Sequence, residues 1–314
     1  MTLFDAGHIL GSASVLLESK HATVLLSGDL GRRGTPILRD PNAAYPPFTR
    51  VDHVVIESTY GDREHPGSSA IEDRLRDVLR RALEDGGKVL IPAFSIGRTQ
   101  ELIYHLRAIA AEGELAGERA GVPIIVDGPM GLEITALYER FPDAWDAQSL
   151  ALRRAGAGPF SFDGLYGART PRASELARTI EGPAIIIAGS GMCAGGRILA
   201  YLEELLPDER TDVLFVGFQA KGTLGRTLVN GARKVVLSGK TIPVRARMTT
   251  LPGLSGHADR RELLAWLAGV PGVRSVFVGH GEPEACDSLA DAITRSLGIP
   301  AVAPAESQPQ SLGT

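Results

Sequence analysis

Short apolar segments that end in glycine-containing turns recur along this chain and constrain its fold more than any other feature. Two of them, 13–17 and 22–26, flank the polar turn at 19–21 and predict a β-hairpin. Later apolar strands alternate with segments of helical spacing, and we expect these strands at 54–56, 88–92, 124–126, 184–187, 213–216 and 275–278. This alternation is typical of an α/β protein with a largely parallel sheet.

Length and composition are those of an ordinary globular protein. The 314 residues are 44% hydrophobic and 22% charged, which favours about two domains. No apolar run approaches the ~18–20 residues that span a membrane, and the N-terminus does not resemble a signal peptide. Cys193 and Cys286 form no CxxC motif. We therefore expect no membrane association and a reducing, cytoplasmic setting.

The charge excludes one kind of nucleic-acid binding and leaves another open. A formal net charge of −4 argues against a broad basic surface that binds phosphate non-specifically. A local basic groove remains compatible with this charge, and so does a scatter of solvated side chains. The basic residues near glycine-rich turns are Arg98, Arg197, Lys221, Arg226, Arg233 and Lys234.

Three of the seven histidines share a setting that suits a functional site. His8, His257 and His280 each have a neighbouring glycine and lie at or just after an apolar strand. Glycine allows the sharp turn that aims a side chain into a cleft at the strand end. The remaining histidines do not share this setting: we expect His21, His53 and His105 to be structural or merely exposed, and His65 stays open.

Two carboxylates occupy the same kind of position. Asp29 follows an apolar strand in LLSGDLG, and Glu57 ends one in VVIESTYG. Imidazole and carboxylate groups together suit zinc, and a catalytic zinc site keeps one position open for water. Any one of these five loops alone is more often structural, but the combination predicts a metal-assisted site.

Eight motifs in order resemble one family. They are DAGHILGSAS, SGDLG, ESTYGDREH, PAFSIGRTQEL, GSGMCAGGR, GFQAKGTLGR, LSGHAD and GHGEP, and they extend over nearly the whole chain. The set resembles the β-CASP family of metallo-β-lactamase-fold ribonucleases, which includes RNase J-like enzymes and the cleavage-and-polyadenylation endonuclease subunit. The resemblance implies an α/β fold: a partial metallo-β-lactamase αββα sandwich (1–61 and 240–304), interrupted by an inserted α/β β-CASP domain (62–239), and a flexible tail (305–314).

The resemblance also implies a role for each of the five residues. His8 would bind one zinc ion, Asp29 would bridge two, and His280 would bind the second. Glu57 would orient His257, which would contact the scissile phosphate or protonate the leaving oxygen. A histidine at the position of His280 is the pattern of the RNA-cutting members.

Turns of the inserted domain are candidates for holding RNA. Two of them precede predicted helices, so their backbone N–H groups could bind phosphates. The alternative is that their glycines simply cap helices. The candidate phosphate-binding residues are Ser95, Arg98, Ser190, Gly191 and Arg197.

One family motif is missing from the sequence. The family's first metal motif, H-x-H-x-D-H, does not occur in these 314 residues, so we expect one zinc ion or none where the intact family holds two. We prefer a truncated gene model or gene fragment to a degenerate RNA-binding protein or to complementation by an N-terminal segment. Truncation predicts an exposed apolar surface on the hairpin at Val15, Leu17, Val24 and Leu26.

The leading functional prediction is a zinc-dependent hydrolase of single-stranded RNA, acting as an endonuclease, a 5′→3′ exonuclease, or both. A non-catalytic RNA-binding pseudoenzyme or scaffold subunit is the alternative. A small-molecule hydrolase is a third interpretation, against which the inserted domain argues. The sequence does not decide whether the chain forms a homo-oligomer.

Overall fold

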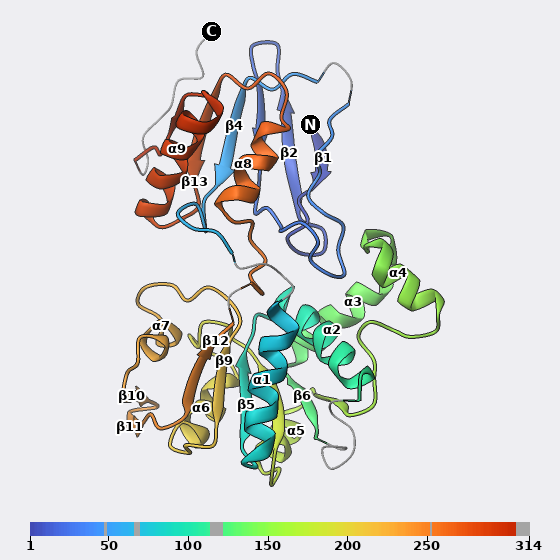
Figure 1. Ribbon diagram of the computed structural model, residues 1–314, viewed down its shortest axis with the longest axis vertical. Coiled ribbons are helices and arrows are strands. Elements are labelled where there is room, and N and C mark those ends of the chain that lie inside the picture. Colours follow the sequence, from blue (N-terminus) through green and yellow to red (C-terminus); the bar gives the residue numbers. More distant parts are fainter. Residues whose placement is uncertain (47–48, 66–69, 114–121, 252, 306–314) are drawn as a thin grey trace. The chain divides into compact units, whose positions relative to one another are not determined.

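A computed structural model describes residues 1–46, 49–65, 70–113, 122–251 and 253–305 (Figure 1). The chain divides into two compact units, each of which is described separately below. The first comprises residues 1–65, 144–146 and 256–314, and the second comprises 66–143 and 147–255. The division lies at 65/66 and 255/256, whereas the sequence motifs suggest 61/62 and 239/240. Most of the expected flexible tail, 306–314, lies outside the described residues.

The first unit is a six-stranded sheet with helices on one face. Its strand order is β1-β2-β3-β4-β13-β14, in which the pairs β3–β4, β4–β13 and β13–β14 are parallel and the pairs β1–β2 and β2–β3 are antiparallel. The predicted hairpin is confirmed as the antiparallel pair β2 and β3. The elements are β1 (Thr2–Asp5), β2 (Ala13–Glu18), β3 (Thr23–Leu26), β4 (His53–Glu57), α8 (Arg260–Ala268), β13 (Ser275–Gly279), α9 (Pro283–Leu297) and β14 (Ala301–Val302).

Alternation along the strands gives this sheet two different faces. One set of residues packs with α8 and α9 into a core that includes Leu25, Ile56 and Trp266. The residues between them form a continuous apolar row across the strands, Leu3, Val15, Leu26, Val55, Phe277 and Val302. Among the residues expected to be exposed, Leu17 is 41% exposed, and the other three are half-buried.

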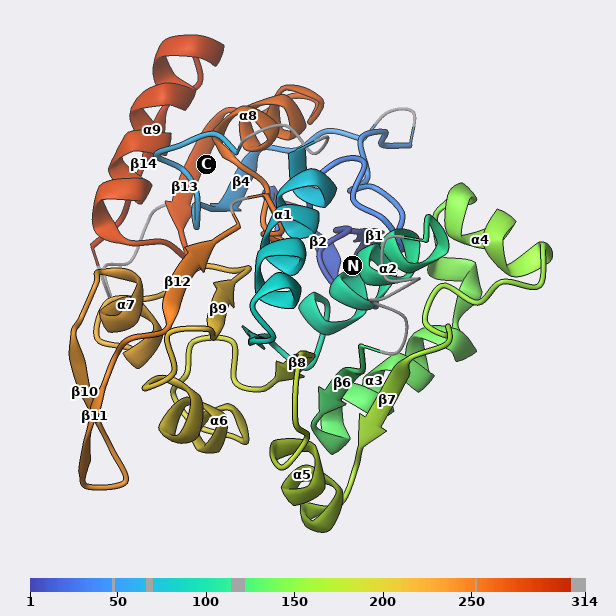
Figure 2. The same cartoon turned by 60° about the horizontal axis from the view of Figure 1, so that its bottom comes forward.

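The second unit is a parallel α/β layer structure, as the alternating pattern predicts. Its six strands have the order β12-β9-β5-β8-β6-β7, and every pair is parallel. Its strands are β5 (Lys88–Pro92), β6 (Ile124–Asp127), β7 (Leu165–Ala168), β8 (Ala184–Ala188), β9 (Asp212–Phe215) and β12 (Arg247–Thr250). A separate hairpin, β10 (Lys234–Leu237) and β11 (Lys240–Pro243), extends from this unit (Figure 2).

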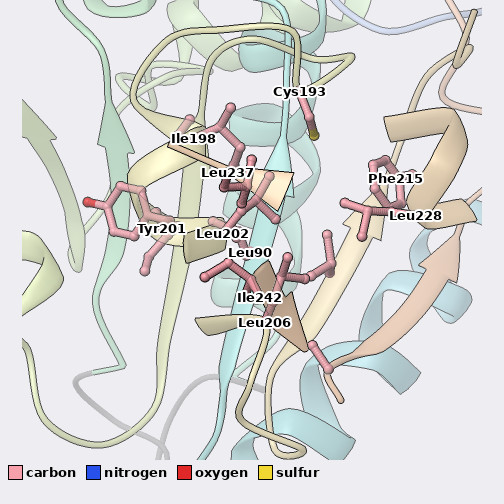
Figure 3. Close-up of a cluster of buried hydrophobic side chains, with 14 of the residues drawn as sticks. Leu90, Cys193, Ile198, Tyr201, Leu202, Leu206, Phe215, Leu228, Leu237 and Ile242 are labelled. Carbon is pink, nitrogen blue, oxygen red and sulfur yellow. The ribbon is translucent and has the colours of Figure 1, made fainter. Parts of the chain in front are cut away.

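Helices connect the strands of the second unit. They are α1 (Ala70–Glu84), α2 (Arg98–Ala111), α3 (Pro129–Arg140), α4 (Ala147–Arg154), α5 (Pro171–Arg178), α6 (Ile198–Leu205) and α7 (Leu224–Val229). One core cluster joins α6 to the central strands, with Leu90, Leu202 and Phe215 buried (Figure 3). None of the described helices combines the length and the apolar composition that a transmembrane passage requires.

Candidate metal and nuclease site

The site residues meet at the carboxyl ends of the central strands in the first unit's sheet. Asp29 lies just after β3, Glu57 ends β4, and His280 follows β13. These three strands are parallel neighbours, and Glu57 stands beside Gly279 in the register, so their carboxyl ends converge. The turn after β1 brings His8 to these strand ends, and the segment before α8 brings His257. All five residues predicted from the motifs therefore lie in one unit.

Glu57 is the buried centre of the site. Its side chain accepts hydrogen bonds from the backbone N–H of Leu30 (2.7 Å, Oε1) and of Thr59 (3.3 Å, Oε2). Nδ1 of His257 lies 3.0 Å from Oε1 and 3.1 Å from Oε2. Burial disfavours the charged form of Glu57, but the hydrogen bonds, led by that of His257, outweigh it and lower the pKa below its ordinary value. Glu57 is therefore an ionised acceptor, and Nδ1 of His257 must carry the proton.

Backbone pairing joins the His257 segment to the Asp29 loop. Gly31 and His257 form an antiparallel bridge, and the N–H of Ala258 donates to the carbonyl of Leu30 at 2.8 Å. A side chain on Gly31 would collide with the loop that carries His8, because a Cβ there would lie 1.9 Å from the carbonyl oxygen of Gly7. Glycine at this position is thus required for the three loops to meet.

Asp29 lies between two histidines. Its Oδ2 is 3.9 Å from Nε2 of His8, and its Oδ1 is 3.3 Å from Nδ1 of His280. Burial, and after it the neighbouring His257, lower the pKa of His8, which favours a neutral ring with a free lone pair. His280 adopts a left-handed conformation (φ 53°) that is uncommon for residues other than glycine.

This donor set fits a divalent metal ion. Ligand atoms of His8, Asp29 and His257 lie within 4.8 Å of one another, and His280 approaches the other oxygen of Asp29. Imidazole nitrogens around a carboxylate are the ligands that zinc prefers. The rings of His8 and His257 are 4.3 Å apart between centroids, so His257 is close enough to join the metal ligands. The motifs indicated a catalytic role for His257 and a metal-binding role for His280.

Two arginines predicted to bind phosphate make internal contacts. Arg98 is buried, and its Nη1 contacts the carboxylate of Glu101 and the carbonyl of Leu254. Arg197 donates to the buried carboxylate of Asp127 at 2.5 Å. Arg197 also donates to the backbone carbonyls of Ala168 (2.8 Å) and Arg169 (3.0 Å).

The other phosphate-binding candidates lie together at the ends of neighbouring strands. Ser95 follows β5 and Ser190 follows β8, and these two strands are parallel neighbours. Gly191 lets the two loops touch, because a Cβ there would lie 2.8 Å from the ring of Phe94. Both serines are half-buried. The Oγ of Ser190 accepts from the N–H of Ala194 at 3.0 Å.

Some residues of the site carry no strong sequence signal. Leu30 and Thr59 contribute backbone N–H groups, which any residue type could supply. The sequence left the role of His65 undecided, and the structure places its ring against the backbone of His257. Asp259 and Glu262 form a capping box at α8, a spacing visible in the sequence as D-x-x-E before an apolar segment.

A sheet-edge cluster of imidazole and carboxylate groups with a buried carboxylate–histidine pair defines a metallo-hydrolase class of site. Two family models match the chain: the Beta-Casp domain at residues 99–228, and the Zn-dependent metallo-hydrolase RNA specificity domain at residues 241–304. The chain belongs to the β-CASP family of metallo-β-lactamase-fold ribonucleases.

Three relatives illustrate this membership. An RNase J-like protein of Methanocaldococcus jannaschii is 32% identical over 96% of this chain and 68% of its own length. A ribonuclease of Thermus thermophilus is 40% identical over 89% of this chain and 62% of its own length. Transcription termination factor FttA of Pyrococcus horikoshii is 37% identical over 97% of this chain and 47% of its own length. The chain thus spans about half to two thirds of the curated relatives that it matches.

Proposed function

We propose that the chain carries the catalytic cleft of a zinc-dependent RNA phosphodiester hydrolase, acting on single-stranded RNA as an endonuclease, a 5′→3′ exonuclease, or both. The observation that carries this proposal is the placement of Asp29 between His8 and His280, with the Glu57–His257 pair beside it. The family-model match to an RNA specificity domain and the ribonuclease relative support the choice of RNA.

His8, Asp29 and His280 would hold the metal. When bound, a divalent metal supplies a nucleophile at neutral pH and neutralises phosphate charge. His257 provides the proton for the leaving oxygen. Its Nδ1–H is fixed on Glu57, so Nε2 is the nitrogen that can face the substrate. The carboxylate stabilises the imidazolium form and keeps the ring aimed.

The loops at Ser95 and Ser190 are proposed to bind the RNA backbone. Both lie at the carboxyl ends of parallel strands, and Gly191 lets the two loops approach each other closely. Arg98 and Arg197 follow these loops in the sequence and would anchor them through hydrogen bonds to the carbonyls of Leu254 and Ala168. The two cysteines are buried and form no disulfide, which fits a reducing cytoplasm as the proposed location.

A non-catalytic RNA-binding subunit is the second candidate, and the number of metal ligands favours it. Among the described residues, the cluster offers three or four protein ligands. Two-metal hydrolysis needs a fuller set. This candidate predicts RNA retention without stoichiometric metal.

Zinc analysis paired with an RNA cleavage assay tests both candidates. The chain is purified, its zinc is measured by elemental analysis, and its cleavage of 5′-labelled single-stranded RNA is followed. We expect His257→Asn to slow cleavage by about 100-fold or more, the usual scale for a lost general acid. His21→Asn, in an exposed turn, is the matched control and should leave cleavage unchanged.

The outcomes separate the candidates. Bound zinc with His257-dependent cleavage supports the hydrolase. RNA retention without zinc and without cleavage supports the non-catalytic subunit. Loss of zinc, cleavage and RNA retention together contradicts both.

A further inference from the structure

The chain leaves the first unit and returns to it beside His257. The first unit's opening segment ends at His65, and, apart from the short segment 144–146, the chain re-enters it at Gly256. The two crossing segments pair with each other: Tyr60 and Asp259 form a parallel bridge, and the N–H of Arg260 donates to the carbonyl of Arg63 at 3.1 Å. The point where the second unit is inserted is therefore part of the wall of the candidate site.

Asp259 fixes the backbone of His65. This aspartate is fully buried, and its Oδ2 accepts from the N–H of His65 at 2.8 Å. Its Oδ1 accepts from the N–H of Glu262 at 2.8 Å, and the Glu262 side chain accepts in return from the N–H of Asp259 at 3.0 Å. One carboxylate thus caps α8 and holds His65 against the start of that helix.

The ring of His65 reaches the backbone of His257. Its Nε2 lies 3.2 Å from the carbonyl oxygen of His257. A carbonyl accepts only, so Nε2 must carry the proton and donate. The edge-on ring of Tyr60, 4.4 Å away between centroids at 64°, limits rotation of the imidazole.

His257 is therefore held at three separate points. Glu57 binds its ring, Gly31 pairs with its backbone on one side, and His65 binds its carbonyl. The peptide unit after His257 is bound at its N–H end, where Ala258 donates to the carbonyl of Leu30, and the hydrogen bond from His65 fixes its carbonyl end. A displacement of a catalytic group by about 1 Å can slow a reaction by about 100-fold.

We propose that His65 is a positioning residue for His257: its Nε2–H fixes the His257 carbonyl and thereby the direction in which the His257 ring faces the substrate. The proposal rests on the proposed hydrolase for its rate readout. It differs from a space-filling role because it needs the donor atom, and the hydrophobic volume of the ring is not sufficient.

Two substitutions at His65 separate these roles. His65→Phe keeps the ring and removes the donor, and His65→Gln keeps a donor at similar reach. We expect His65→Phe to lower kcat by about 10–100-fold, the usual effect of losing an orienting partner, with KM and zinc content within about twofold of wild type. His65→Gln should recover most of the lost rate. If His65→Phe does not fold, His65→Ala with His65→Gln makes the same comparison.

His53 offers a matched control. It is a buried histidine of the first unit, whereas His65 is half-buried, and its Nδ1 lies 2.9 Å from Oγ of Ser275. It starts β4, and Glu57 ends that strand. His53→Phe should lower the melting temperature and leave kcat unchanged. A kcat for His65→Phe that stays within about twofold of wild type, or that falls no further than that of His53→Phe, would overturn the proposal.

A second readout keeps this test independent of cleavage. Imidazole NMR of ¹⁵N-labelled protein detects the Nδ1–H of His257, assigned with His257→Asn. His65→Phe should shift or broaden this signal, and His53→Phe should not. If wild type does not cleave RNA, the proposed hydrolase fails, and an unshifted His257 signal in His65→Phe would then refute the positioning role by itself.

Discussion

Nδ1 of His257 lies 3.0 Å and 3.1 Å from the two carboxylate oxygens of Glu57. These residues are 200 positions apart in the sequence, and the second unit is inserted between them. The contact fixes both the tautomer and the direction of the imidazole, because an ionised carboxylate accepts only. The same carboxylate also accepts from the N–H of Leu30, next to Asp29, so a single buried group aligns His257 and the loop proposed to bind metal.

Replacing Glu57 should remove the charged partner of His257 without releasing zinc from the site. Glu57→Gln keeps an oxygen acceptor but removes the charge that stabilises the imidazolium. We expect RNA cleavage to slow by about 10–100-fold while zinc content stays near wild type. Single-turnover cleavage and elemental analysis provide the measurement. Glu18→Gln, at an exposed strand end, is the control, and an equal loss in both variants would refute the assignment.

Adding one methyl group at Gly31 should separate the His8 and Asp29 loops. Gly31→Ala places a Cβ against the carbonyl of Gly7, so one loop must move. We expect destabilisation of about 1–3 kcal/mol, as for overpacked cores, together with weaker zinc binding. Chemical denaturation and zinc titration measure the two effects. Gly128→Ala, where a Cβ meets open space, should change neither, and unaltered zinc affinity in Gly31→Ala would show that the loops move independently.

The buried carboxylate of Asp127 depends on Tyr201. The Tyr201 hydroxyl donates to Asp127 at 2.7 Å, and its oxygen points away from the aliphatic cluster in Figure 3. Burial raises the pKa of Tyr201, which keeps the hydroxyl protonated as a donor. We expect Tyr201→Phe to cost about 1.5–3 kcal/mol, the range for a hydrogen bond to a charged group. Urea unfolding measures this, with exposed Tyr166→Phe as the control; equal midpoints would mean that Arg197 and Ser174 satisfy Asp127 alone.

Acid should weaken the contact between α1 and α2. The hydrogen bond from His105 lowers the pKa of Glu72 below its ordinary 4.5. A lowered carboxyl pKa contributes stability that is fully present above the unfolded value of 4.5 and is lost as pH falls through the folded pKa. The difference in unfolding free energy between wild type and Glu72→Gln should therefore be largest at neutral pH and vanish in strong acid. Thermal melts from pH 7 to pH 3 measure it.

The control for that experiment is Glu133→Gln, at an exposed position of α3. Its stability difference from wild type should stay small and flat with pH. A Glu72→Gln difference that persists below the lowered pKa would instead indicate a packing effect of the amide.

Much of the fold follows from local sequence pattern. The apolar segments at 88–92, 184–187 and 275–278 coincide with β5, β8 and β13, because buried parallel strands need uninterrupted apolar residues. The strand order is a different matter. β13 lies between β4 and β14, and β5 lies between β9 and β8, through crossovers that no local pattern encodes.

The candidate site also has features that the sequence predicts and features that it does not. His8, Asp29, Glu57, His257 and His280 could be selected from the sequence because a glycine beside a polar residue at a strand end is a local signal, reinforced by the family motifs. The role of His65 could not, since it depends on a backbone carbonyl 192 residues away. Arg98 and Arg197 resembled phosphate ligands in the sequence, but the structure occupies both guanidinium groups with internal acceptors.

The sequence by itself thus determined the α/β class, the family and the residue types of the candidate metal-binding cluster. These depend on apolar periodicity and on glycines whose effects are local. Tertiary structure alone decided that Asp29 lies between two histidines, that Glu57 holds His257, and that the chain leaves and re-enters the first unit at that histidine. Those relationships depend on hydrogen bonds between segments distant in the chain, and such contacts exist only once the sheet has brought its strand ends together.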